Sequence, residues 1–140
     1  MNYLNWEKQI VYNSPHPEVM KKQISLQDAA SQWANLAAFV ASLYQNDFDL
    51  MRRSMQDIVA EPIRSQFIPY FDQLRQAANQ SNAISFGISG SGPSVFAFAK
   101  SKQDAVQIKE RLLAVFENTS IETLCFIERL TNNHGCKLIG

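Results

Sequence analysis

The residues with the clearest capacity for chemistry form a short loop of serine, glycine and proline. Glycine lets a phosphate or a second backbone approach without a Cβ in the way. The N–H groups of such a loop, together with its serine hydroxyls, can form a concave site for an anion. The sequence therefore indicates either an ordinary hairpin loop or an anion site. The residues concerned are Gly87, Ser89, Gly90, Ser91, Gly92 and Pro93.

This loop does not match the common nucleotide-binding patterns. It lacks the lysine of a Walker loop, and a strand-like run follows it where a dinucleotide fingerprint needs a helix. Apolar runs with aromatic residues flank it at 83–88 and 94–99. Two such runs around a glycine-containing break are typical of a β-hairpin, so the loop is expected at a hairpin tip.

Arg64 is the second candidate for contact with an anion. Pro62 suits the first turn of a helix, where its missing N–H costs nothing. Arg64 would then lie in that first turn, near the positive end of the helix dipole, where a basic residue is unfavourable. An arginine at such a position is either a solvated surface residue or one held there to meet an anion.

The rest of the chemical inventory is sparse. His16 and His134 are the two histidines, and both fall in predicted loops. Asp57 and Glu61 are explained as a helix cap and a solvated helix face. The loop serines have no candidate base nearby that would make them nucleophiles. The sequence therefore predicts no certain catalytic residue and no metal site.

A long helix is predicted over residues 26–45. Ser25 and Asp28 have the spacing of an N-terminal cap, and apolar residues then recur at helical spacing. Large aromatic side chains on an apolar stripe usually pack inside a protein. We therefore expect Trp33 and Phe39 to lie in the core.

The remaining pattern predicts alternating strands and helices. The run at 121–130 is apolar on both faces, so we expect both of its faces to be covered. The elements follow one another as strand, helices, strand, strand, helix and strand. This order predicts an α+β, ferredoxin-like split βαβ sandwich. Extra helices follow the first strand, and the helices are expected on one face of the sheet. Strands are expected at 9–12, 83–88, 94–99, 121–130 and 136–139, and further helices from Asp47, Pro62, Pro69 and Ser101.

Composition places the chain among ordinary globular domains. Its 140 residues suit one domain, 1–140. Thirteen basic and thirteen acidic side chains cancel, which gives no electrostatic reason to expect nucleic acid or a membrane as partner. No run approaches the roughly 18 apolar residues of a membrane span. Cys125 and Cys136 lack metal-ligand spacing, so we expect free thiols and a cytoplasmic location.

Residues 87–94, Gly-Ile-Ser-Gly-Ser-Gly-Pro-Ser, resemble the third motif of the GHMP kinases, a superfamily that includes galactokinase, homoserine kinase and mevalonate kinase. Residues 57–64, Asp-Ile-Val-Ala-Glu-Pro-Ile-Arg, resemble the segment that homoserine kinases carry before this loop, as does Phe-Ile-Pro at 67–69. The helix over 26–43 is similar too. Together these segments resemble homoserine kinases in particular.

The resemblance implies phosphorylation of the L-homoserine hydroxyl by ATP with Mg²⁺, on the way to threonine. Such phosphoryl transfer rests on positioning and charge stabilisation. By this mapping, Arg64 and Gly90 bind the substrate. The loop residues support the family's main phosphate loop and border the substrate pocket. Those support residues are Gly87, Ser89, Gly90, Ser91, Gly92 and Pro93.

Two features depart from the family pattern. The family's main phosphate loop and its N-terminal nucleotide-binding domain have no counterpart in these residues, so residues 1–140 correspond to the C-terminal domain alone. Asn13 and Pro17 stand where homoserine kinases usually carry the Thr and Arg of a Thr-x-x-x-Arg pattern. We therefore expect the chain alone to bind no cofactor, to be inactive and to be capable of forming a homodimer. The alternative is a non-enzymatic, ferredoxin-like module for small-molecule binding or dimerisation.

Overall fold

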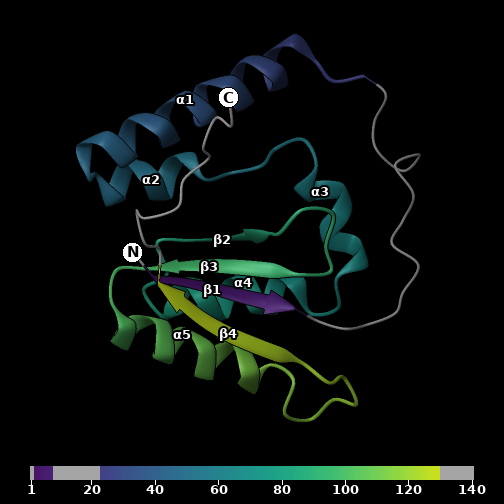
Figure 1. Ribbon diagram of the computed structural model, residues 1–140. Helices are drawn as coiled ribbons and strands as arrows, with labels where there is room; N and C mark the ends of the chain where they lie inside the picture. The colour runs from purple at the N-terminus through teal and green to yellow at the C-terminus, as the bar shows by residue number, and fades with distance from the viewer. Residues whose placement is uncertain (1, 8–22, 130–140) are drawn as a thin grey trace, which may run out of the picture.

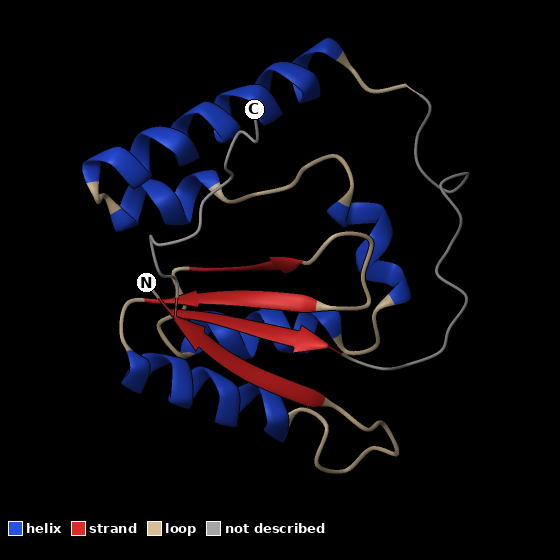
Figure 2. Cartoon of the chain, viewed as in Figure 1, coloured by secondary structure: helices blue, strands red, loops and turns tan. Residues whose placement is uncertain are grey.

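The computed structural model describes residues 2–7 and 23–129 (Figures 1 and 2). Within them, four strands form one sheet, and the helices lie on both of its sides. The elements in chain order are β1 (Asn2–Glu7), α1 (Leu26–Gln45), α2 (Phe48–Ser54), α3 (Glu61–Arg64), the 3₁₀ turn η2 (Ser65–Phe67), α4 (Phe71–Gln80), β2 (Ser85–Ile88), β3 (Val95–Ala99), α5 (Lys102–Ala114) and β4 (Leu124–Arg129).

The sheet is antiparallel, with strand order β2-β3-β1-β4. β2 and β3 form the expected hairpin, in which Ile88 pairs with Val95 next to the loop. β1 lies between β3 and β4, so the first strand is central and the last lies at an edge. The predicted α+β class with an antiparallel sheet is confirmed, and the strand order fits a split βαβ arrangement.

The first strand lies earlier in the chain than the sequence suggested. The run at 9–12 falls outside the described residues, as does the last predicted strand at 136–139. The strand observed instead is β1, which pairs along its length with both β3 and β4.

The main core lies between the sheet and the helices α4 and α5, which cover one face together (Figure 1). Alternate residues of β3 point into it, as the two-residue period of a strand requires. Burying each large side chain here contributes about 1.5–3 kcal/mol. Its fully buried members include Leu74, Ala97, Ile108 and Leu112.

A second, smaller apolar cluster lies on the opposite face of the sheet. Met51 of α2 packs there with Ile84 and Phe98, and the partly buried Phe39 and Phe96 join them. The expectation that the helices gather on one face is therefore wrong. β3 carries apolar side chains in both directions, so it is stable only when both of its faces are covered.

α1 has the predicted bounds. It also has the predicted cap, since the Ser25 side chain accepts a hydrogen bond from the Asp28 N–H at 3.0 Å. Its orientation is not the one expected. The Trp33 side chain is 64% exposed, and Phe39 is only partly buried, so the prediction that both lie in the core is wrong for Trp33. The apolar stripe of α1 turns away from the domain.

Polar side chains hold the inner face of α1. Gln32 accepts a hydrogen bond from the Ile58 N–H at 3.0 Å, and Asn35 donates to the Gln56 carbonyl at 3.3 Å. These two bonds fix α1 to the segment that leads into α3. They satisfy backbone groups that the irregular segment leaves unpaired, on the side of α1 that faces the domain.

Among the described residues, β4 is covered on one face only, against expectation. Cys125 and Ile127 pack against the main core, whereas Leu124 and Phe126 are 53% and 46% exposed. Pairing through β1 puts Phe126 on the same sheet face as Phe96. The α1–α2 pair covers this face at the β2–β3 end and does not extend over β4 (Figure 1).

The thiol of Cys125 gives a prediction for alkaline pH. Burial raises its pKa from 9.0 to about 11, although the charge of Lys109 opposes the rise. Between these values the unfolded chain has lost a proton that the folded chain keeps, so stability falls as pH rises from about 9 to about 11. We expect Cys125→Ser to flatten this decline, as measured by urea unfolding at a series of pH values. An unchanged slope would contradict the assignment.

Candidate functional site

The structure brings together the two candidate anion-binding features, Arg64 and the glycine loop. The Arg64 Nη1 donates a hydrogen bond to the Gly90 carbonyl at 2.6 Å, across 26 residues of sequence. α3 is a single turn with Pro62 near its start, so Arg64 is its last residue. The expected placement near the positive end of the helix dipole is therefore wrong, since a one-turn helix puts a fourth residue at its C-terminal end.

The loop itself is closed by backbone hydrogen bonds. The Ser89 N–H donates to the Ser94 carbonyl at 2.8 Å, and the Gly92 N–H donates to the Ser89 carbonyl at 3.1 Å. The peptide bond that joins Gly92 to Pro93 is cis. In the described part of the chain, the N–H groups of Gly90 and Ser91 have no acceptor. These two donors are available for an anion.

The other predicted loop residues play different parts in the geometry. Gly87 lies within β2, where an added Cβ would come 3.1 Å from the Phe96 ring, so its small size serves packing. The Ser91 hydroxyl is exposed and lies 3.4 Å from the Gly92 carbonyl. Ser89 takes part through its backbone.

We expect Gly92→Ala to lower the free energy of unfolding by about 1–2 kcal/mol, the usual cost of the left-handed conformation with a Cβ. Gly92 has φ +77°, and an added Cβ would also meet Ile68 at 3.1 Å. Gly90→Ala is the matched control, because Gly90 has φ +61° and open space around it. Chemical denaturation should show the larger loss for Gly92→Ala. A larger loss for Gly90→Ala would contradict this view.

An ion pair that sequence reasoning missed anchors α3. Arg75 of α4 donates from Nη2 to the Glu61 Oε1 at 2.6 Å, and the Glu61 side chain is only 13% exposed. The Arg75 guanidinium also lies 4.8 Å from the centre of the Phe71 ring, while its buried Nε lacks a partner among the described residues. Glu61 is therefore not a solvated helix residue. A separation of 14 residues, across a turn and a helix boundary, gives no local signal of the pair.

Asp57 does not form the helix cap that the sequence suggested, since the N-cap residue of α3 is Ala60 and no side chain caps this helix. Its carboxylate accepts hydrogen bonds from the Val59 and Ala60 N–H groups at 2.9 and 2.8 Å, just before α3 begins. Asp57 and Arg75 thus hold residues 59–61, which lead into the turn that presents Arg64. A fixed α3 keeps the guanidinium against the loop, and such preorganisation favours binding of a charged group.

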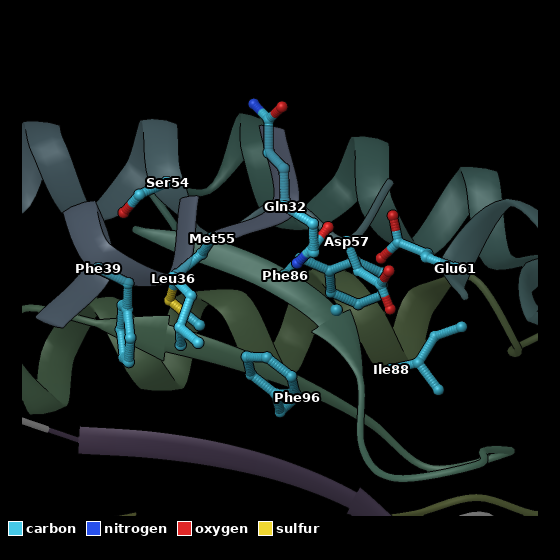
Figure 3. A pocket seen from close by; sticks show the side chains of 12 residues that line it. Gln32, Leu36, Phe39, Ser54, Met55, Asp57, Glu61, Phe86, Ile88 and Phe96 are labelled. Carbon is cyan, nitrogen blue, oxygen red and sulfur yellow. The ribbon is translucent and has the colours of Figure 1, made fainter. Parts of the chain in front are cut away.

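A cavity of about 210 Å³ lies beside this arrangement, between α1, the end of α2 and the β2–β3 hairpin (Figure 3). Phe96 forms its floor, Leu36 and Phe39 come from α1, and Glu61 lies at one end. Arg64 and Gly90 are not among its lining residues. The cavity therefore adjoins the contact between Arg64 and the loop and does not contain it.

The described residues include groups that could bind the negative charge of a substrate such as ATP. The Arg64 guanidinium and the free N–H groups of the loop suit a phosphate or a carboxylate. No group of three or more histidine, cysteine, aspartate or glutamate side chains is placed to hold a metal ion within residues 2–7 and 23–129. The donor set thus fits an anionic substrate. In the same ranges, no helix is long and apolar enough to cross a membrane.

Residues 39–118 match the family described as GHMP kinases C terminal. This stretch includes α2, the segment with Arg64, the glycine loop and α5. It is more than half of the chain.

Curated relatives agree with this match. The chain is 43% identical over 98 residues to a homoserine kinase of Chlorobaculum tepidum, which covers 70% of the chain and 30% of the relative. It is 35% identical over 122 residues to a homoserine kinase of Xylella fastidiosa, covering 87% of the chain and 38% of the relative. The chain thus spans about a third of the length of these relatives.

Solved structures show the same fold. A crystal structure of homoserine kinase from Cytophaga hutchinsonii matches with a TM-score of 0.87 and 35% identity, over 92% of this chain and 41% of that chain. A putative homoserine kinase from Listeria monocytogenes matches with a TM-score of 0.63 at 18% identity, which supports the fold alone.

Proposed function

Because the chain belongs to the C-terminal family of the GHMP kinases, we propose that it is the substrate-side domain of an ATP-dependent homoserine kinase. The observation that carries this proposal is the contact between Arg64 and the Gly90 carbonyl, which joins the two segments resembling homoserine kinases. Relatives at 35–43% identity that are homoserine kinases support it. The reaction is transfer of the terminal phosphoryl group of ATP to the hydroxyl of L-homoserine, a step toward threonine.

Arg64 binds the negative charge of the reactants in this proposal. One of its nitrogens holds the loop through Gly90, and no described carboxylate pairs with it. A guanidinium can contact a carboxylate or a phosphate through two parallel hydrogen bonds. Arg64 would grip either the homoserine carboxylate or the transferring phosphate, and so stabilise the charge that accompanies phosphoryl transfer.

The glycine loop supports the phosphate-binding part of the enzyme. Its Gly90 and Ser91 N–H groups are free to donate to an anion or to a neighbouring backbone, and Ser89 and Gly92 keep the loop closed. ATP supplies the phosphoryl group, and Mg²⁺ would neutralise its charge. The residues that hold ATP and Mg²⁺ lie in the nucleotide-binding domain, so the chain alone binds neither of them. The chain acts only together with that domain, in the cytoplasm.

Two assays test the proposal. The purified 140-residue chain, given ATP, Mg²⁺ and L-homoserine, should form no phosphohomoserine. A hybrid enzyme, made by replacing the superposed segment of the Cytophaga hutchinsonii homoserine kinase with this chain, should form it. A matched hybrid without L-homoserine controls for ATP hydrolysis.

Each assay can contradict the proposal. Turnover by the chain alone would show that no second domain is needed. A folded hybrid that binds ATP but leaves L-homoserine unphosphorylated would instead favour a non-enzymatic binding or dimerisation module. Since Asn13 and Pro17 replace a threonine and an arginine of the family pattern, we expect the hybrid to have a higher KM for homoserine than the parent enzyme.

A further inference from the structure

The outward face of α1 is apolar along its whole length. Leu26, Trp33, Val40 and Tyr44 follow one another at spacings of seven, seven and four residues, which return to one side of a helix. Their exposed fractions are 79%, 64%, 44% and 87%. We call these four side chains the α1 stripe. It points away from the polar inner face that Gln32 and Asn35 form.

Exposure of this apolar face to water is energetically unfavourable. The only charged residue in α1 is Asp28, in its first turn, so the helix has none from residue 29 to residue 45. A solvated helix face normally carries charges. Burying each large side chain of the stripe would contribute about 1.5–3 kcal/mol. Alanines at 30, 37 and 41 leave room for close approach of another element.

The stripe also connects with the candidate site. Leu36, which is 60% exposed, follows Trp33 by three residues on α1 and lines the cavity beside Phe39 and Met55 (Figure 3). A protein domain packed on α1 would therefore also reach the rim of that cavity. In Figure 1, α1 lies at the outer edge of the domain, with α2 and the sheet on one side only.

The length of the relatives indicates what covers the stripe. The chain superposes on 41% of the Cytophaga hutchinsonii enzyme, which leaves 59% of that enzyme outside the match. Resting on the proposed function, we propose that the α1 stripe is the docking surface for this remaining, nucleotide-binding part of a homoserine kinase. Docking on α1 brings that part to the rim of the cavity that Leu36 lines.

Thiol labelling tests the proposal without measuring activity. Val40→Cys places a thiol in the stripe, and Val106→Cys on α5 is the matched control, since the two valines are 44% and 38% exposed. Each variant is made in the chain alone and in the hybrid enzyme, and the labelled residue is located by mass spectrometry. We expect Cys at position 40 to react at least about tenfold more slowly in the hybrid than in the chain alone, because a covered thiol reacts only after local opening. Position 106 should react at the same rate in both.

The outcomes separate this proposal from the proposed function. Equal labelling at position 40 in an active hybrid would overturn the docking surface and leave the function intact. Protection at position 40 in an inactive hybrid would support the surface and contradict the function. Concentration-dependent protection in the chain alone, with a dimer's mass, would assign the stripe to a second copy and overturn the proposal. If the hybrid fails to fold, the solved Cytophaga enzyme decides: the residue superposing on Val40 should be buried by residues outside the matched segment.

Discussion

Replacing Arg64 with alanine should lower kcat/KM of the hybrid enzyme for L-homoserine by roughly 30- to 5,000-fold, which corresponds to about 2–5 kcal/mol. The guanidinium contacts the glycine loop, since its Nη1 lies 2.6 Å from the Gly90 carbonyl. Its removal takes away the charge that meets the substrate and also releases the loop. Steady-state kinetics with varied homoserine and ATP would measure the loss and divide it between kcat and KM.

Two further variants distinguish the loss of substrate recognition by Arg64 from a general loss of enzyme activity. Arg64→Lys keeps the charge but cannot form a bidentate contact, so its kcat/KM should fall between those of the parent and Arg64→Ala. Arg111→Ala, which removes an exposed arginine from α5, should leave kcat/KM unchanged. An Arg64→Ala hybrid with the parent's kcat/KM would show that Arg64 is an ordinary surface residue.

Breaking the pair between Glu61 and Arg75 should be the most destabilising of the polar substitutions considered. Arg75→Ala leaves the Glu61 carboxylate, which is 13% exposed, without its counter-ion, and also removes the guanidinium over Phe71. Removing one partner of a buried pair costs about 3–5 kcal/mol. Since the Arg75 side chain is 40% exposed, we expect about 2–3 kcal/mol, allowing for this exposure. Urea unfolding of the chain measures it directly.

A double-mutant cycle shows whether the loss comes from the pair. Glu61→Gln removes the charge but keeps the shape, so combining it with Arg75→Ala should recover at least about 1 kcal/mol relative to the sum of the single losses. Strict additivity would mean that the two side chains do not interact. The pair also fixes α3, so kcat/KM of the hybrid should fall together with stability in the Arg75→Ala variant.

Local elements could be predicted from the sequence because local forces decide them. The cap at Ser25, the cap at Asp47 and the hairpin around residues 89–93 were all indicated by residues a few positions apart, and all are present. The glycine loop and the Glu-Pro-x-Arg segment likewise pointed to the homoserine kinases, and the family match confirms that resemblance. Short-range signals of this kind survive folding, since the hydrogen bonds that create them lie within one turn.

Only the tertiary structure decided which faces are covered and which distant residues meet. The apolar stripe of α1 predicted a buried face, yet Trp33 points outward, and Gln32 and Asn35 instead bind the backbone of the segment at 56–58. Periodicity shows that a helix has an apolar face but does not show what covers it. Glu61 and Arg75, like Arg64 and Gly90, meet across turns and strands. The path of the whole chain sets those distances, so the spacing of these residues in the sequence carried no signal of either contact.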